Sequence, residues 1–324
     1  MMTETKKKRR ISAIFSLCPA AHTVLLASAA LIALHLFTRH NKPFMRALSE
    51  SVIAPLHQRM ASFCALFGAV SVAEVLIAAF ALAVLSYIVY ELVCLAAKSE
   101  RIKRLYRMSI RLSATALVVY AGYSMLWGVY YYGDDFIAKS GLDNGEISVE
   151  QLETVTVYFA EKLNDYAALA TRDQQGFYIA DRDEILDKSP DVYLVMEQAF
   201  PCLEGPDIRA KGLRFSRILS YMDFTGFFFP FTAEANLNTD FPPGLFASTV
   251  AHELAHQRGV AKEQEANFVA VLACLDYGDV DYCYSACMLA YTHLGNALHG
   301  VDYDAWYMVY SGLDERVKTV TSPS

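Results

Sequence analysis

The first 132 residues of the chain contain three apolar stretches that are each long enough to cross a lipid bilayer. They cover residues 17–37, 68–96 and 112–132. A hydrocarbon layer of roughly 30 Å needs a helix of about 20 apolar residues, and the chain carries no formal charge between Arg10 and Arg39. The sequence therefore predicts three transmembrane helices in a membrane domain, residues 1–132, followed by one globular domain, residues 133–324.

The first apolar stretch has a second interpretation, as a signal peptide. Basic residues at positions 6–10 precede it, and Ala27, Ser28 and Ala29 are similar to the small-residue site at which such a peptide is cleaved. The apolar stretch continues past this site. We therefore favour a helix that is retained as a membrane anchor.

The net charge changes sign at residue 132, where the apolar part of the chain also ends. Residues 1–132 contain 15 Lys and Arg against 5 Asp and Glu, and residues 133–324 contain 13 against 30, which gives net charges of +10 and −17. The basic N-terminus and the basic loop 98–111 are predicted to be cytoplasmic, and the third span then places the acidic domain on the extracytoplasmic side. The basic loop 39–59 departs from this rule. Membrane lipid is an expected partner, whereas the acidic domain has no basic stripe for nucleic acid.

The globular domain is expected to be mostly helical. Ser148 and Gln151 form a capping-box pattern that predicts a helix over 149–170. The segment 225–238 is rich in Phe and Thr and is interrupted by Pro230, which favours an extended strand. Directly before the motif described next, such a strand could pair by its free edge with a peptide substrate.

The motif that carries chemistry is His252-Glu253-Leu254-Ala255-His256. Two histidines four residues apart lie on one face of a helix, so that both imidazoles can bind one ion. Zinc lowers the pKa of a bound water to about 7, and a nearby carboxylate can then act as the general base. The motif therefore predicts a zinc centre with Glu253 as its catalytic base.

A third ligand has to come from a second helix. In a continuous helix Glu263 would lie about 10 Å along the axis from His256, so the chain must turn, and Gly259 can adopt the left-handed conformation that ends a helix. In a second helix over 261–274, Glu263 and Glu265 point in different directions, and we favour Glu263 as the ligand, with Glu265 as its competitor. Asn267, one turn later, is expected to hydrogen-bond a zinc histidine.

Further site residues are less constrained by the sequence. Tyr284 and His293 are candidates for a group that stabilises the oxyanion. Glu234, Asn236 and Asn238 are candidate cleft residues that bind substrate, or equally the polar residues of a core strand. The sequence does not decide whether Cys202 forms a disulfide with Cys274, Cys283 or Cys287.

Two runs of residues resemble a known family. They are HELAHQRGVAKEQEANFVA, which begins at His252, and FPFTAEANLNTDFPP, which ends at Pro243. Together they resemble the bacterial membrane family catalogued as domain of unknown function 3810, whose members are expected to be gluzincin-like. The resemblance implies that His252, His256 and Glu263 are metal ligands and Glu253 the base. The chain departs from the family's form at Ala233, where glycine is expected, and at Gln264, where an acid is expected.

The expected fold class is therefore mainly α, with three N-terminal transmembrane helices and a mostly helical, zincin-like α+β domain with a short edge strand. The expected function is that of a membrane-anchored zinc metallopeptidase that cleaves peptide or protein substrates in the cell envelope. The alternative is a non-catalytic, zinc-binding membrane sensor or scaffold. Glu253 favours the enzyme, because a structural zinc site needs no base.

Overall fold

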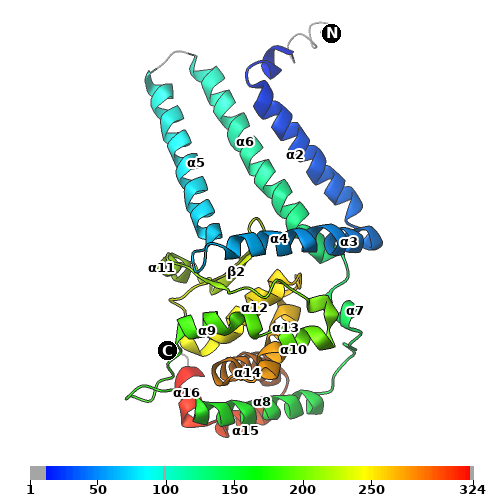
Figure 1. The fold of residues 1–324 in the computed structure, drawn as a ribbon, viewed down its shortest axis with the longest axis vertical. Helices are drawn as coiled ribbons and strands as arrows, with labels where there is room; N and C mark the ends of the chain where they lie inside the picture. The colour runs from blue at the N-terminus through cyan, green and yellow to red at the C-terminus, as the bar shows by residue number, and fades with distance from the viewer. Residues whose placement is uncertain (1–11, 98–99, 322–324) are drawn as a thin grey trace. The chain divides into compact units, whose positions relative to one another are not determined.

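The computed structural model describes residues 12–97 and 100–321 as mainly helical, with one small sheet (Figure 1). The chain forms two compact units. The first comprises Met1–Ser51 and Ala73–Gly133, and the second comprises Val52–Val72 and Asp134–Ser324. The second unit thus includes a segment, 52–72, that lies between two of the expected spans.

The first unit consists of long helices and short connections. Their bounds are α2 Pro19–Thr38, α3 Lys42–Leu48, α5 Val72–Ala97, α6 Arg101–Leu126 and the 3-10 helix η2 Gly128–Tyr132, and the π-helix η1, Ser49–Ile53, leads into the second unit. His22 of α2 is 2.9 Å from the Tyr106 hydroxyl of α6. Glu91 of α5 is buried and forms an ion pair with Arg104 at 2.8 Å.

Two of these helices, α2 and α5, are long and apolar enough to cross a membrane. The third expected span, 112–132, does not form a helix with those bounds, and this prediction is wrong in detail. The helix α6 begins eleven residues earlier, at Arg101, so its first half carries basic residues, and it ends at Leu126. Residues 128–132 form the 3-10 helix η2 instead. The basic residues at positions 6–10 and Lys98 lie outside the described residues.

The second unit contains the sheet and the remaining helices. Their bounds are α4 Ala54–Ala65, α7 Phe136–Ser140, α8 Val149–Leu169, α9 Arg182–Lys188, η3 Ser189–Asp191, α10 Leu194–Ala199, η4 Pro201–Leu203, β1 Lys211–Gly212, α11 Ser216–Tyr221, β2 Gly226–Phe229, β3 Glu234–Leu237, η5 Pro243–Leu245, α12 Phe246–Gln257, α13 Glu263–Tyr277, α14 Val280–Val301, α15 Tyr303–Ser311 and α16 Glu315–Thr321. The helix predicted over 149–170 is confirmed as α8, including its capping box between Ser148 and Gln151.

The segment 225–238 forms two strands instead of one. The sheet has the order β1-β3-β2, with β1 parallel and β2 antiparallel to β3. Ala233, in the turn between β2 and β3, has a φ of 55°, a conformation that favours glycine. Of the two strands from this segment, β2 lies at an edge of the described sheet and β3 lies at its centre.

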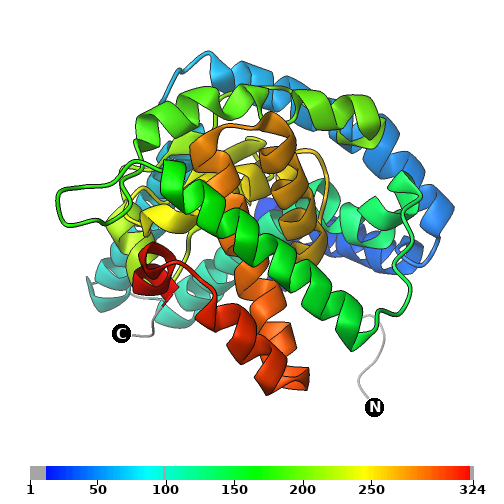
Figure 2. The ribbon, with the colours of Figure 1, turned by 90° about the horizontal axis from the view of Figure 1, so that it is seen from below.

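The core of the second unit surrounds α12. Ten of its twelve residues are buried, and α12 contacts the sheet on one side and α13 and α14 on the other. Figure 2 shows α8 crossing α14, which it covers. Small residues of α12 and α13 such as Ala251, Ala255, Ala266 and Ala270 are completely buried, so the backbones of the two helices can approach closely.

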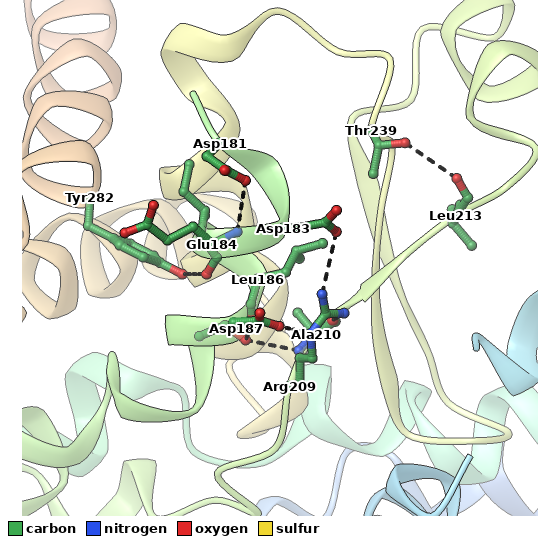
Figure 3. A network of polar contacts seen from close by, with 12 residues as sticks. Asp181, Asp183, Glu184, Leu186, Asp187, Arg209, Ala210, Leu213, Thr239 and Tyr282 are labelled. Atoms are coloured by element: carbon green, nitrogen blue, oxygen red, sulfur yellow. Dashed lines mark hydrogen bonds and ion pairs between the residues drawn. The ribbon is translucent and has the colours of Figure 1, made fainter. Parts of the chain in front are cut away.

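Polar contacts attach α9 to the segment just before the strand β1 and to α14 (Figure 3). The hydroxyl of Tyr282 donates to the Ile185 carbonyl at 2.7 Å, and Arg209 forms ion pairs with Asp187 and Asp183. Tyr282 is completely buried, so its hydroxyl cannot bond to water. The hydrogen bond to the Ile185 carbonyl replaces that contact. These contacts hold the segment before the sheet in place.

Candidate metal centre

A glycine turn brings α12 and α13 side by side. Gly259 has a φ of 85°, and the Val260 N–H donates to the Ala255 carbonyl at 3.1 Å, which closes the end of α12. After this turn α13 begins at Glu263. The turn predicted at Gly259 is therefore confirmed, and Glu263 faces the histidines of α12.

The side chains of His252, His256 and Glu263 converge at one point. His252 Nε2 lies 3.2 Å from Glu263 Oε2, and His256 Nε2 lies 3.6 Å from Glu263 Oε1. One ligand atom from each residue lies within 4.8 Å of the other two. The arrangement could hold a metal ion.

The outer nitrogens of the two imidazoles determine what the inner nitrogens can do. His256 Nδ1 is 2.7 Å from the Val260 carbonyl, which can only accept, so Nδ1 carries the proton. His252 Nδ1 is 2.8 Å from Asn267 Oδ1, which is also an acceptor. In the neutral imidazoles both Nε2 atoms then present lone pairs toward a carboxylate. Two lone pairs and a carboxylate facing one another fit a cation between them, so the residues present suit a bound metal.

The exposed fractions of these side chains indicate an open site. The side chains of His252 and His256 are 14% and 8% exposed, whereas that of Glu263 is 66% exposed. The cluster is thus supported by protein on the side of α12 and faces solvent beside α13. A structural metal site is normally closed by protein ligands, whereas a catalytic site keeps one position open.

Glu265, the competing ligand, has other partners. Its Oε2 accepts from the Phe136 N–H at 2.8 Å, and its Oε1 lies 3.5 Å from Lys262 Nζ, which also pairs with Asp135. The side chain is nearly buried. Glu265 therefore attaches the start of the 134–321 segment to α13, and of the two acids only Glu263 faces the histidines.

Glu253 lies beneath the edge strand β2. Its side chain is buried, and its Oε2 has no hydrogen-bond partner among the described residues. A Cβ on Gly226 would lie 3.0 Å from Glu253 Cγ and Oε1, so only glycine allows the strand to approach this closely. The Phe228 backbone N–H donates to the carboxylate, but burial dominates and raises the pKa of Glu253.

The cluster also perturbs the titration of its own members. When their Nε2 atoms carry a proton in place of a metal ion, His252 and then His256 donate hydrogen bonds that lower the pKa of Glu263 well below its ordinary range. Burial alone would lower the pKa of His256, but the adjacent Glu263 and Glu253 carboxylates raise it. Both shifts reflect opposite charges that stabilise one another at short distance.

The two candidate oxyanion donors lie in different places. His293 of α14 is exposed, and its Nε2 is 3.4 Å from Asn267 Nδ2, on the side of Asn267 away from the histidine cluster. Tyr284 is completely buried, with its ring 4.8 Å from that of Tyr178. The structure therefore brings His293 close to the centre through Asn267 and places Tyr284 in a separate part of the core.

The three candidate cleft residues are buried on the central strand. Glu234 Oε1 accepts from the Val72 N–H at 3.1 Å, and Asn236 Oδ1 accepts from Ser71 Oγ at 2.6 Å. Asn238 Nδ2 donates to Ser220 Oγ and to the Phe224 carbonyl. Their side chains thus hold the segment before α5 and the segment around α11 on the sheet.

Two residues near the centre could not be found from the sequence. Gly226 and Phe228 reach Glu253 only because β2 pairs with β3 and lies across α12. A glycine at the start of the aromatic run 226–229 was the one available signal. None of the seven cysteines, all in the described part of the chain, forms a disulfide, so the bridge considered for Cys202 is not present.

Comparison with protein families gives one result. The model of a family described as "Protein of unknown function (DUF3810)" matches residues 50–322, and the chain belongs to this family. The match covers most of the chain, including α4, α5, α6 and the whole metal centre. Comparisons with curated proteins and with solved structures find no match.

Proposed function

We propose that the protein is a membrane-anchored, zinc-dependent metallopeptidase with a zincin-like site. The observation that carries this proposal is the convergence of His252 Nε2, His256 Nε2 and a Glu263 carboxylate oxygen within 4.8 Å, next to a buried carboxylate, Glu253. Three protein ligands with an exposed side are typical of a catalytic zinc ion.

The roles of the residues follow from this geometry. His252, His256 and Glu263 would hold the ion, which supplies Lewis acidity for hydrolysis of a peptide bond. Glu253 takes a proton from the attacking water and returns it to the departing amine. Asn267 and the Val260 carbonyl hold the two imidazoles in the tautomer that presents Nε2.

The edge strand β2 offers a binding site for an extended peptide substrate. Gly226 and Phe228 of this strand contact Glu253, so an extended peptide paired with the free edge of β2 would lie beside the strand that covers the proposed base. Strand addition of this kind uses backbone hydrogen bonds and tolerates varied side chains. His293, next to Asn267, remains a candidate to stabilise the developing oxyanion, whereas buried Tyr284 has no role in this proposal.

We also propose that the chain crosses the membrane three times, with the N-terminus in the cytoplasm and the second unit outside. Residues 52–72, before α5, and residues 134–321, after α6, belong to one folded unit, so a membrane topology has to place both segments on the same side. A chain that crosses along α5 must therefore cross again before Asp134. The helix available is α6, whose part after Arg111 carries no charge.

The length of that part of α6 is compatible with a crossing. Residues 112–126 span roughly 22 Å at about 1.5 Å per residue, which is short of a full bilayer core. The long side chains of Arg107 and Arg111 can extend to the interface, and a bilayer thins locally around a short span. Snorkelling arginines and local thinning of the bilayer together make a slightly short third crossing feasible.

The test compares two substitutions in the full-length protein purified in detergent. Glu253→Gln is expected to keep bound zinc and lose cleavage of a peptide library, because only the base is removed. His252→Ala is expected to lose both, because a ligand is removed. The sensor or scaffold alternative predicts that wild-type protein binds zinc, cleaves nothing, and is unaffected in its cellular phenotype by Glu253→Gln.

A further inference from the structure

The second unit carries a surface of exposed apolar residues on the sheet face opposite the metal centre. Alternation along β3 places Ala235 and Leu237 toward α12, and Glu234, Asn236 and Asn238 toward the other face. These polar side chains hold two segments there. The first segment is 66–72, at the end of α4, and the second surrounds α11.

Both segments expose large apolar side chains. After α4, Leu66 is 79% exposed, and in α11 Tyr221 is 87% exposed. With Phe63 in the last turn of α4, the exposed residues that we take to define this apolar face are Phe63, Leu66, Phe67, Ile218, Tyr221 and Met222. An exposed apolar group of this kind marks an interaction site, because a soluble surface rarely leaves it uncovered.

The chain itself identifies what covers this face. Val72, whose N–H is bonded to Glu234, is the first residue of α5, a 26-residue helix apolar enough to cross a membrane. The face is therefore attached directly, with no linker, to a helix that is long and apolar enough to cross a bilayer. Arg214, just before α11, and Arg217, within α11, are also exposed, although the domain as a whole is acidic. Apolar and aromatic residues flanked by arginines are typical of a surface that lies in the lipid interface.

We propose that this apolar face is embedded in the headgroup region of the bilayer, and that the metal centre therefore acts on peptide segments next to the membrane surface. Glu253 lies against Gly226 on one side of the sheet, and Ser71 lies against Asn236 on the other. One sheet layer, on the order of 10 Å, separates the proposed base from the start of α5. The substrate class is thus the juxtamembrane segment of a membrane-anchored protein or peptide. This part of the inference rests on the proposed function.

The first experiment tests the surface without reference to activity. A photoreactive phenylalanine replaces Tyr221 in the full-length protein, reconstituted in nanodiscs of phosphatidylcholine and phosphatidylglycerol. The matched control replaces Tyr307, which is 54% exposed. It belongs to α15, a helix at the opposite end of the second unit from α11 (Figure 1). Lipid adducts several times more abundant at position 221 than at 307 are expected. Equal adducts at both positions, or adducts at 221 to protein in place of lipid, would overturn the proposed surface.

The second experiment tests the substrate class. Synthetic peptides attached to a transmembrane helix carry the same cleavable sequence at increasing distances from the bilayer, and a free peptide serves as the reference. Cleavage by the reconstituted protein is expected to be fastest close to the membrane and to decline as the spacer lengthens. Rates that do not depend on the spacer would overturn the substrate class. Failure of the proposed function has a different signature, because no substrate is then cleaved in a manner that Glu253→Gln abolishes, while the lipid adducts at position 221 still form.

Discussion

The helix α5 exposes apolar side chains, whereas the helix α12 buries ionisable ones. Of the 26 residues of α5, three are buried, and its exposed side chains are almost all apolar. Of the twelve residues of α12, ten are buried, and these include Glu253 and His256. A helix that is apolar all round needs an apolar solvent, whereas a helix that buries ionisable groups incurs a desolvation cost that packing alone does not explain.

The comparison separates two kinds of constraint. In α5 the composition matters and individual apolar residues are interchangeable, because lipid has no fixed shape. In α12 single atoms matter, because each buried polar group depends on one partner, such as Asn267 for His252 or Val260 for His256. Substitutions are therefore expected to have sharp effects around α12 and α13 and weak effects on α5.

The largest effect is expected from Glu263→Ala. Removal of one of three ligands should lower zinc affinity by about a thousandfold or more, well beyond the roughly 10–100-fold effect of supporting residues. The measurement is zinc competition with a fluorescent chelator. The neighbouring exposed residue provides the control, since Gln264→Ala should leave affinity unchanged. Equal affinities in the two variants would exclude Glu263 as a ligand.

A large loss of stability is expected from Arg258→Ala. The Arg258 side chain is 1% exposed, forms ion pairs with Glu197 and Asp207 at 3.1 and 2.6 Å, and covers the Tyr193 ring. Removal of one partner from a buried charge cluster costs about 3–5 kcal/mol, or a fall in melting temperature of roughly 10 °C for a unit of this size. Thermal unfolding in detergent measures this. Leu85→Ala on α5, where the side chain is 60% exposed, should change little, and an equal fall in both variants would remove the contrast between the regions.

An intermediate effect is expected from pH, through His57 of α4. Burial lowers the pKa of His57 to about 4, so between the ordinary value near 6.5 and pH 4 the unfolded chain binds a proton that the folded chain does not. Stability is therefore complete above about pH 6.5 and falls as pH decreases, by at most about 1.4 kcal/mol per pH unit. The His57→Phe variant should flatten the pH dependence of the melting temperature between pH 6.5 and 4. If the melting temperature depends on pH in the same way in the wild type and in His57→Phe, His57 is not the cause of the loss of stability at low pH.

The smallest effect is expected from Asn267→Ala. Loss of the carbonyl that accepts from His252 should reduce zinc affinity by about 10–100-fold. Asn267→Asp, which keeps an acceptor at the same place, should recover most of the loss. If Ala and Asp variants bind zinc equally, the contact with His252 does not tune the site.

Local rules made the convergence of His252, His256 and Glu263 predictable from the sequence. The spacing of His252 and His256, the turn at Gly259 and the face occupied by Glu263 all depend on helix geometry over a dozen residues. The long-range parts were not accessible in the same way. Ser71 and Asn236 are 165 residues apart in sequence, and no local pattern indicates that the segment before α5 joins the globular unit.

The strand residues show why the functional and structural interpretations of a polar residue are hard to separate. Glu234 and Asn236 are polar, alternate along a strand and precede the motif, as cleft residues would, but their side chains point away from α12 because β3 turns its other face to it. The residue that does approach Glu253 is Gly226. It has no side chain, so its residue type did not indicate a role at the site. Ala233 is a related case, since its positive φ in the turn between β2 and β3 gives a physical reason for the glycine that the resemblance led us to expect there.

X-ray absorption at the zinc edge of the full-length protein tests the central claim most directly. The account predicts one zinc ion per chain, bound by two imidazole nitrogens and oxygen ligands at roughly 2.0–2.2 Å, with the imidazole signal lost in His252→Ala. A zinc environment with sulfur ligands near roughly 2.3 Å, or one unchanged in His252→Ala, would contradict it.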